Sequence, residues 1–290
     1  MTKSSAKILL AAVFAARGSS FLFSKFLMED LSAESILAVR FLISFVILAV
    51  VFHRKLRTCS IASLKGGIIL GTAYSICMFF EMHGLKTIDS GVSSFVENMA
   101  IVLVPLYVAV WTRKLPEKKT MICALLAIVG VWFLSISQMN GGLNPGIILT
   151  IAAAMTYAVC ILLTERVSKE GDPITIGIIQ LGVMGAVNLV AAVASRTAAI
   201  PESGREWAMI LMLAVVCSCF GFTFQPLGQK YLSAETAAVF SVVNPLTASI
   251  LGVIIAGESM GIAKATGYVL ILGSLLLYNR ADQPSGRPGT

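Results

Sequence analysis

The sequence predicts an all-α integral membrane protein with ten transmembrane helices, arranged as two inverted five-helix repeats. Hydrophobic residues make up 57% of the 290 residues and charged residues only 13%, whereas soluble domains carry about a quarter charged residues. The mean hydropathy is +0.87. The apolar residues form ten runs, each close to the roughly 20 residues that span a bilayer. The order of features in the first half also recurs in the second.

The ten runs predict the helices in order along the chain. The first run follows Lys3 and Lys7 and continues past Arg17 to Leu27, which favours a retained helix over a cleaved signal peptide. Pro145 starts the sixth helix, where its missing N–H costs no helical hydrogen bond. The expected helices span residues 6–27, 36–52, 66–82, 90–111, 120–136, 146–164, 174–194, 207–229, 236–255 and 263–278.

The positions of the Lys and Arg residues predict the orientation. With both termini inside, 15 of the 22 basic residues lie in inner connections and five in outer ones, while Arg17 and Arg40 lie within helices. Cytoplasmic loops are enriched in Lys and Arg. We therefore expect a multi-pass protein of the bacterial plasma (inner) membrane with cytoplasmic N- and C-termini. The net charge of +7 then reflects orientation, and we expect no nucleic-acid partner.

The second half of the chain repeats the first at an offset of about 144 residues. Gly-Leu-Lys-Thr at 84–87 opens the segment through the fourth helix, and Gly-Gln-Lys-Tyr at 228–231 opens the segment through the ninth. Five crossings are an odd number, so the second unit enters the membrane from the opposite side, as in many secondary transporters. The predicted units are residues 1–140 and 141–281, followed by a disordered cytoplasmic tail at 282–290.

The polar segments of the two units resemble a known family. They read Gly-Leu-Lys-Thr-Ile-Asp-Ser-Gly-Val-Ser-Ser-Phe at 84–95 and Gly-Gln-Lys-Tyr-Leu-Ser-Ala-Glu-Thr-Ala-Ala-Val-Phe-Ser-Val-Val-Asn-Pro-Leu at 228–246. With Gly257 and Glu258 after the ninth helix, they resemble the EamA-type branch of the drug/metabolite transporter (DMT) superfamily. Lys114 stands in the first unit where the second has Glu258. The resemblance implies ten helices around a central cavity and, in many members, export of amino acids or other small metabolites.

Two charged residues within the apolar runs are the strongest candidates for function. Arg17 lies about 16 Å from either end of its helix, and Glu97 about 10 Å from the outer end of its own. An ionised group at such depth costs several kcal/mol unless it has a partner or water. Three hypotheses stay open: an ion pair broken by solute or proton, separate binding of a solute carboxylate by Arg17 and its amine by Glu97, and a permanent structural pair.

Further polar and aromatic residues are expected to line the solute or coupling site, because they share helix faces with these charges or occupy matching helices of the second unit. They are Tyr74, Ser94, Asn98, Tyr157, Gln225, Phe240, Ser241 and Asn244. Pro105, Pro226 and Pro245 each remove a helical hydrogen bond, which predicts hinges or local unwinding, or else fixed kinks. Arg40 and Glu81 are expected near the outer rim, with Arg40 reaching the surface.

These residues favour a secondary active transporter over an enzyme. No nucleophile–base set, nucleotide-binding loop or cofactor motif occurs, and two His and six Cys residues without a CxxC pair give no metal site. The leading hypothesis is export of a small polar metabolite, an amino acid or related amine, by alternating access, with protons as the candidate coupling ion. The alternatives are uptake of an organic cation or nucleobase-like solute, a passive facilitator, and a lipid-handling or assembly protein. Membrane lipids are expected partners, and both a monomer and a homodimer stay open.

Overall fold

The computed structural model describes residues 1–113, 118–138 and 144–279, and in these ranges all regular structure is helical. The predicted tail at 282–290 and Lys114 lie outside the described residues. The helices are α1 Lys3–Leu27, α2 Ala33–Val51, α3 His53–Arg57, α4 Ile61–Leu85, α5 Ser90–Glu97, α6 Ala100–Thr112, α7 Lys118–Ser137, α8 Pro145–Glu170, α9 Pro173–Ala194, α10 Gly204–Met212, the π-helix η1 Leu213–Phe222, α11 Thr223–Gln229, α12 Ala234–Phe240, α13 Val243–Ala256 and α14 Ile262–Asn279.

Polar side chains fix where many of these helices begin. Thr2, Ser32, Ser60, Ser203 and Ser233 each accept a hydrogen bond from the backbone N–H three residues later, at the starts of α1, α2, α4, α10 and α12. Such a cap satisfies one of the N–H groups that have no partner within a helix. In an apolar surround these caps matter more, because lipid offers no alternative partner.

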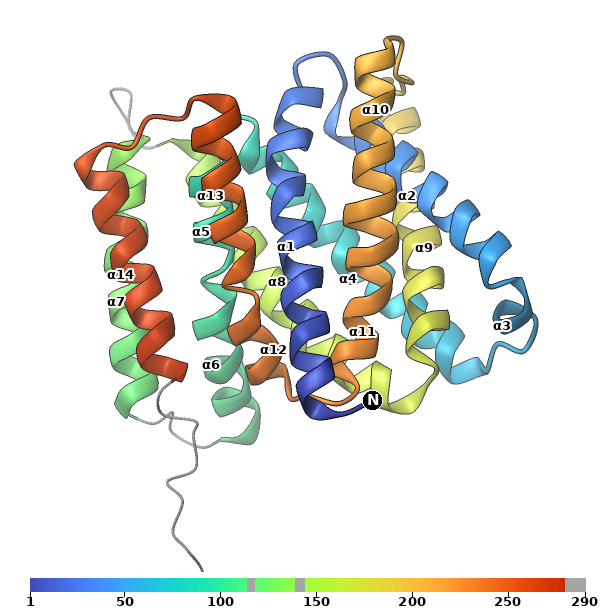
Figure 1. Cartoon of the computed structure of the whole chain (residues 1–290), viewed down its shortest axis with the longest axis horizontal. Helices are drawn as coiled ribbons and strands as arrows, with labels where there is room; N and C mark the ends of the chain where they lie inside the picture. Colours follow the sequence, from blue (N-terminus) through green and yellow to red (C-terminus); the bar gives the residue numbers. More distant parts are fainter. Residues whose placement is uncertain (114–117, 139–143, 280–290) are drawn as a thin grey trace, which may run out of the picture.

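Within the described residues, eight helical segments are long and apolar enough to cross a membrane, counting α5–α6, α10–α11 and α12–α13 as one segment each. Two further apolar helices are shorter, Met121–Ser137 within α7 and Ile262–Ser274 within α14. The N-terminus and the last turn of α14 lie at the same end of the bundle (Figure 1). The prediction of a helical protein with several membrane-length apolar segments is thus confirmed.

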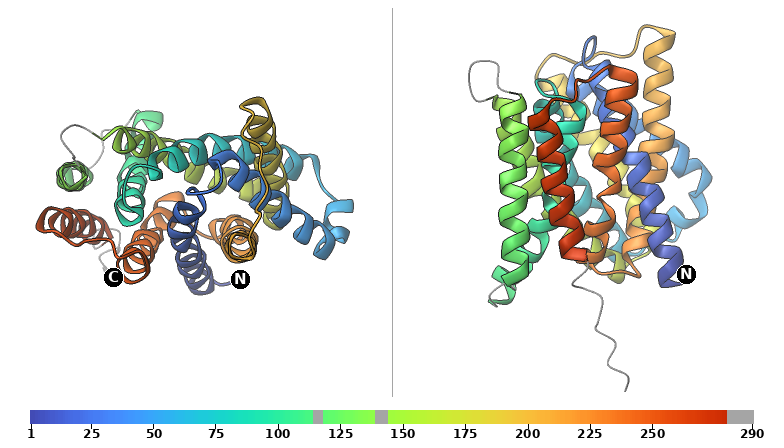
Figure 2. Two further views of the ribbon diagram at one scale, coloured as in Figure 1. Left: turned by 90° about the horizontal axis from the view of Figure 1, so that it is seen from above. Right: turned by 60° about the vertical axis from the view of Figure 1, so that its left-hand side comes forward.

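The bundle has two rows of helices, which are clearest when it is viewed end-on (Figure 2). One row holds α14, α13, α1 and the α10–α11 segment, with α1 packed between α13 and η1. In the other row α4 packs on both α8 and α9, while α2 packs on α9. Gly67 and Gly71 of α4 allow this close packing, because a Cβ there would lie 2.6 Å from Ile179 and Val183 of α9, respectively.

Two predicted continuous helices are interrupted at matching positions. The fourth predicted helix breaks at Asn98 and Met99 between α5 and α6, and the ninth breaks at Ser241 and Val242 between α12 and α13. Pro245 has no N–H to bond the Ser241 carbonyl, and the Asn244 N–H bonds it instead at 2.9 Å. The break before α6 lies well upstream of the next proline, so proline chemistry accounts for the second break and not for the first.

The eighth predicted helix is also irregular. Its middle ten residues, Leu213–Phe222, form the π-helix η1 between α10 and α11. Phe222 stands four residues before Pro226, so its carbonyl lacks the usual helical donor. π-helical turns are rare and occur often at functional sites. This one faces α1 and α2, the two helices that carry the buried arginines.

Candidate functional site

Arg17 lies at the centre of a buried polar cluster. Only 4% of the residue is exposed. Its Nη1 donates hydrogen bonds to Gln225 Oε1 at 2.6 Å and to Tyr157 Oη at 3.3 Å. Gln225 Nε2 in turn donates to Tyr74 Oη at 3.0 Å and to Gln229 Oε1 at 2.9 Å. Four of the predicted site residues, from α1, α4, α8 and α11, are therefore brought together.

Aromatic rings surround the same guanidinium. Its carbon lies 4.3 Å from the ring centre of Phe222, 5.1 Å from that of Tyr157 and 5.5 Å from that of Tyr74. Such faces attract a cation, and more strongly where water is scarce. The backbone of η1 approaches closely here, since a Cβ at Gly221 would lie 2.8 Å from Arg17 Cγ. Sequence reasoning missed Phe222, because nothing in the pattern places it on the π-helical turn.

Arg17 does not form an ion pair with Glu97 within the described part of the chain. Glu97 is 1% exposed, and its Oε1 lies 3.9 Å from the Cys77 thiol, a long and weak contact. Its Oε2 has no hydrogen-bond partner. Glu97 and Glu81 both lie within electrostatic range of Arg17. The charge of the guanidinium is therefore compensated by carboxylates that form no ion pair with it, and the guanidinium can still bind a further anionic group.

The expectation that Arg40 reaches the surface is wrong, and Glu81 is buried as well. Arg40 is 1% exposed and Glu81 3% exposed. Arg40 Nε donates to Ser218 Oγ of η1 at 3.1 Å, and its guanidinium carbon lies 4.8 Å from the Phe41 ring centre. Because α2 packs on η1, Arg40 is covered by protein before it can reach a surface. The buried interior thus holds two arginines and two glutamates.

The remaining predicted residues divide between the helix breaks and an apolar cluster. Ser94, Asn98, Ser241 and Asn244 are buried at the two breaks, and Ser94 Oγ, Asn98 Oδ1 and Asn244 Oδ1 have no hydrogen-bond partner. Ser241 Oγ donates to its own helix, to the Ala238 carbonyl at 2.6 Å. Phe240 packs in an apolar cluster with the first half of α1. Buried polar atoms without partners are costly, and three lie near the interrupted backbone.

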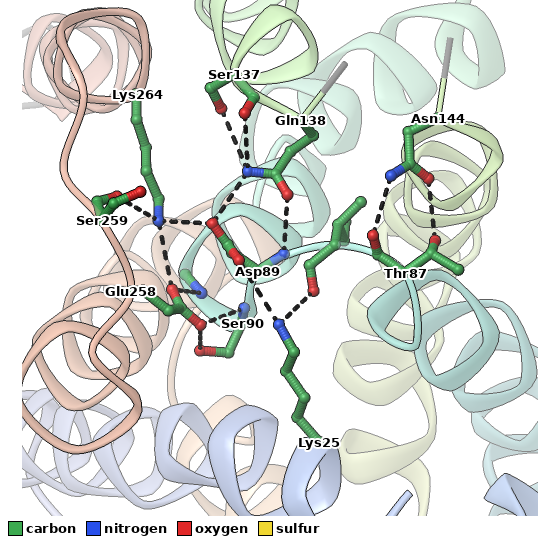
Figure 3. Close-up of polar contacts among 12 residues, drawn as sticks. Lys25, Thr87, Asp89, Ser90, Ser137, Gln138, Asn144, Glu258, Ser259 and Lys264 are labelled. Carbon is green, nitrogen blue, oxygen red and sulfur yellow. Dashed lines mark hydrogen bonds and ion pairs between the residues drawn. The ribbon is translucent and has the colours of Figure 1, made fainter. Parts of the chain in front are cut away.

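A second polar cluster closes the end of the bundle opposite the N-terminus (Figures 1 and 3). Lys264 Nζ of α14 lies 2.9 Å from Asp89 Oδ2 and 3.5 Å from Glu258 Oε2, and its side chain is 3% exposed. Glu258 accepts bonds from Ser90 N at 2.7 Å and Ser90 Oγ at 2.5 Å, at the start of α5. Lys25 of α1 lies 3.7 Å from Asp89 Oδ1. We call this set of five residues the outer cluster.

The outer cluster joins segments from both halves of the chain. Glu258 and Lys264 lie more than 160 positions after Ser90 and Asp89. Partial burial opposes ionisation of Asp89, yet the hydrogen bond and charge of Lys264 hold the pKa of this carboxyl below its usual value. Gln138 Nε2 at the end of α7 also donates to Asp89 Oδ2 at 3.0 Å. Sequence reasoning noted Glu258 only as part of a motif and gave it no partner.

A carboxylate also caps the second interrupted helix at the other end. Glu165 Oε2 of α8 accepts a hydrogen bond from Ala234 N at the start of α12 at 2.7 Å. Ser90 and Ala234 are 144 positions apart, which is the offset that the sequence predicts between the two units. An anionic group at a helix N-terminus is favourable because the first N–H groups have no partner within the helix. The two interrupted helices are thus held in a similar way.

The described residues contain no group of His, Cys, Asp and Glu side chains that could hold a metal ion. No disulfide joins any of the six cysteines in the described ranges. Arg17 can accept a carboxylate through its fork of donors, Glu97 and the amide oxygens can accept from an amine, and the buried phenols can donate or accept. The arrangement suits recognition of a small polar solute rather than covalent chemistry.

Comparison with known proteins places the chain among transporters. An uncharacterized transporter of Archaeoglobus fulgidus is 25% identical over 61% of this chain and 62% of its own length. The uncharacterized transporters YwfM and YetK of Bacillus subtilis are 24% and 23% identical, over 59% and 98% of this chain and 58% and 89% of their own lengths. The chain therefore spans less than two thirds of the archaeal relative and of YwfM.

The fold and the family agree with these relatives. A solved crystal structure superposes with a TM-score of 0.73 at 16% identity, covering 98% of this chain and 100% of that one, which shows a shared fold. The model of the EamA-like transporter family matches twice, at residues 4–136 and 144–280. The resemblance read from residues 84–95 and 228–246 is thereby confirmed, and the chain belongs to the EamA-like transporter family.

Proposed function

We propose that this protein is a secondary active transporter that moves a small metabolite bearing a carboxylate, an amino acid or a close relative, by alternating access. The observation that carries the proposal is the buried guanidinium of Arg17, which has neutral hydrogen-bond partners in Tyr157 and Gln225 and no ion pair in the described part of the chain. A buried arginine of this kind favours an anionic group that can form a bidentate pair with it.

The surroundings of Arg17 favour a carboxylate over an organic cation as the ligand. Tyr74, Tyr157 and Phe222 would suit a cationic ligand, but the guanidinium itself already lies against all three rings. A second cation there would meet like charge. The unpartnered oxygens of Glu97 and Asn98 offer acceptors for the amine of a zwitterion. This favours the second hypothesis for the two charges, in which Arg17 and Glu97 bind opposite ends of one solute.

Alternating access is supported by the way in which the halves meet. Arg17 and Tyr157 are 140 positions apart, the offset that aligns the first helices of the two units. In a pair of inverted repeats, two residues at corresponding positions are expected to contact each other where the symmetry axis passes between the repeats. The two helix breaks are matched as well, and the outer cluster closes one end of the bundle. We propose ten crossings, with α7 and α14 as the shorter pair.

The same proposal includes location and topology. The excess of Lys and Arg in alternate connections supports cytoplasmic termini in a bacterial plasma membrane, with the outer cluster at the external side. Pro105, Pro226 and Pro245 remain the proposed hinges, together with the break at Asn98 and Met99, which the sequence does not predict. Export is the proposed direction, and protons are the proposed coupling ion.

A ligand-stabilisation screen tests the proposal. The purified full-length protein is heated with amino acids, with the amines that lack their carboxylates, and with quaternary ammonium compounds. We expect the carboxylate-bearing compounds to raise the unfolding temperature, because a ligand stabilises the state that binds it. Arg17→Gln should abolish this rise, whereas Arg205→Gln, at an exposed position of α10, should leave it unchanged.

Transport by the stabilising compound is then measured in proteoliposomes with an imposed proton gradient. Accumulation against the solute gradient supports secondary active transport. Equilibration without accumulation identifies a passive facilitator. Equal stabilisation by the amines and quaternary compounds, or stabilisation that survives Arg17→Gln, overturns the assignment of Arg17 as a carboxylate ligand.

A further inference from the structure

Two buried acids face each other across α4 and α5. Glu81 on α4 and Glu97 on α5 are 3% and 1% exposed. Cys77 lies one turn before Glu81 on the same face of α4, and its Sγ is 3.9 Å from Glu97 Oε1. The two carboxyl groups are close enough to share a hydrogen bond. Sequence reasoning had placed Glu81 at the rim and so did not connect it with Glu97.

The groups around this pair come from four helices in the middle of the bundle (Figure 1). Positive charge approaches from two sides, since the guanidinium groups of Arg17 of α1 and Arg40 of α2 both lie within electrostatic range of Glu81. The Cys77 thiol of α4 and the Tyr157 phenol of α8 also interact with the pair. Behind them, Tyr74 of α4 and Cys160 of α8 interact with Cys77 and with each other.

This environment disfavours two ionised carboxylates side by side. Like charges repel strongly where water does not screen them, and adjacent carboxyl groups in proteins commonly keep one proton between them. A shared proton lets one carboxyl group donate a hydrogen bond to the other. Glu97 Oε2 has no other hydrogen-bond partner, so a proton bound there displaces no existing contact.

We propose that Glu81 and Glu97 form a carboxyl pair that binds one exchangeable proton between them. The assignment of that proton to coupling rests on the proposed transport function, whereas the binding of the proton does not. Without the proton, the pair attracts the amine of a zwitterionic solute more strongly. With the proton bound that attraction is weaker, so the proton and the amine compete for the pair, as export driven by inward proton flow requires.

Infrared difference spectroscopy of the purified full-length protein tests this without any solute. A protonated buried carboxyl group has a carbonyl-stretch band distinct from that of an ionised carboxylate, and its intensity is followed from about pH 5 to about pH 9. The wild type should show a titrating band that disappears in the Glu81→Gln/Glu97→Gln double variant. Glu202→Gln, at an exposed position before α10, should leave the band unchanged.

The single variants distinguish a shared proton from two independent acids. In Glu81→Gln and in Glu97→Gln the remaining carboxyl group should hold its proton about tenfold less tightly, because the neighbouring charge that repelled its ionised form is gone. Titration of either single variant at the wild-type midpoint overturns the pair. So does a wild-type spectrum without a protonated band, a result that needs no variant to fold. If the carboxyl pair titrates as expected but no solute stabilises the protein, the proposed function is refuted and the carboxyl pair is not.

Discussion

Removal of Lys264 should open the outer end of the protein. Its ammonium group joins Asp89 and Glu258, and the Lys264 and Glu258 side chains are 3% and 5% exposed. In Lys264→Ala the two carboxylates keep their places in the closed form but lose the cation between them. Opening of this end separates them and lets water solvate both. The substitution therefore destabilises the closed form more than the open one.

The size of the effect follows from burial. Loss of one partner from a fully buried ion pair costs about 3–5 kcal/mol. Asp89 is 29% exposed and lies 3.7 Å from Lys25, so we take the lower end, about 3 kcal/mol. Since about 1.4 kcal/mol corresponds to a factor of ten, the open population should rise by roughly 100-fold.

The open population can be read from the labelling of a buried cysteine. Val92 is fully buried in the first turn of α5, two residues after Ser90 of the outer cluster. In a variant whose six native cysteines are replaced, Val92→Cys reacts with a membrane-impermeant thiol reagent only when this end opens. If opening and closing are fast, the labelling rate is proportional to the open population. We therefore expect roughly 100-fold faster labelling in Lys264→Ala.

A matched variant shows whether the effect belongs to the cluster. Lys86 is an exposed lysine between α4 and α5, and Lys86→Ala removes the same charge from the same end of the molecule. It should leave the labelling rate close to that of the parent. Equal rates for the parent and Lys264→Ala, or equal acceleration by both substitutions, would show that the outer cluster does not hold this end closed.

Two further predictions concern stability. Because the pKa of Asp89 is lowered in the folded protein, its ion pair stabilises the protein above the ordinary carboxyl pKa of about 4, and this contribution is lost as the pH falls through the folded pKa. The unfolding temperatures of wild type and Asp89→Asn should therefore differ at neutral pH and converge below about pH 4. A constant difference at all pH values would contradict this origin. Gly221→Ala places a methyl group 2.8 Å from Arg17 Cγ and should lower the free energy of unfolding by about 1–3 kcal/mol, as measured by denaturant titration. Gly204→Ala, whose added Cβ would have nothing within 4 Å, should leave it unchanged. Equal effects of the two substitutions would exclude the close approach of η1 to α1 as the cause.

Much of the fold and part of the site could be predicted from the sequence. Apolar runs of membrane length are predicted to be helical from their length and composition alone. The position of Arg17 along its run is likewise read from the sequence, without knowledge of which helices pack against it. The contacts of Arg17 with Tyr157 and Gln225 bring together three residues that the sequence assigns to one site. Burial of Glu97 was likewise predicted, because hydropathy along the chain already places an acid inside the membrane.

The rest depends on contacts that sequence patterns do not encode. Distance from a helix end alone places Arg40 and Glu81 at the rim, whereas packing of α2 on η1 covers Arg40 and Glu81 of α4 is buried too. The break at Asn98 has no proline to mark it. The outer cluster joins residues more than 160 positions apart, and no local pattern pairs Lys264 with Asp89 or Glu258 with Ser90.

The hydrogen bond between Arg17 and Tyr157 also bears on how such a chain can have evolved. Arg17 and Tyr157 lie equally far from the starts of the two family matches, at residues 4 and 144, yet one is a cation and the other a phenol. A protein assembled from two identical copies of either unit would set two guanidinium groups, or two phenols, against each other at that point. Gene fusion removes this restriction, because each copy can then diverge independently and the meeting point can hold complementary chemistry.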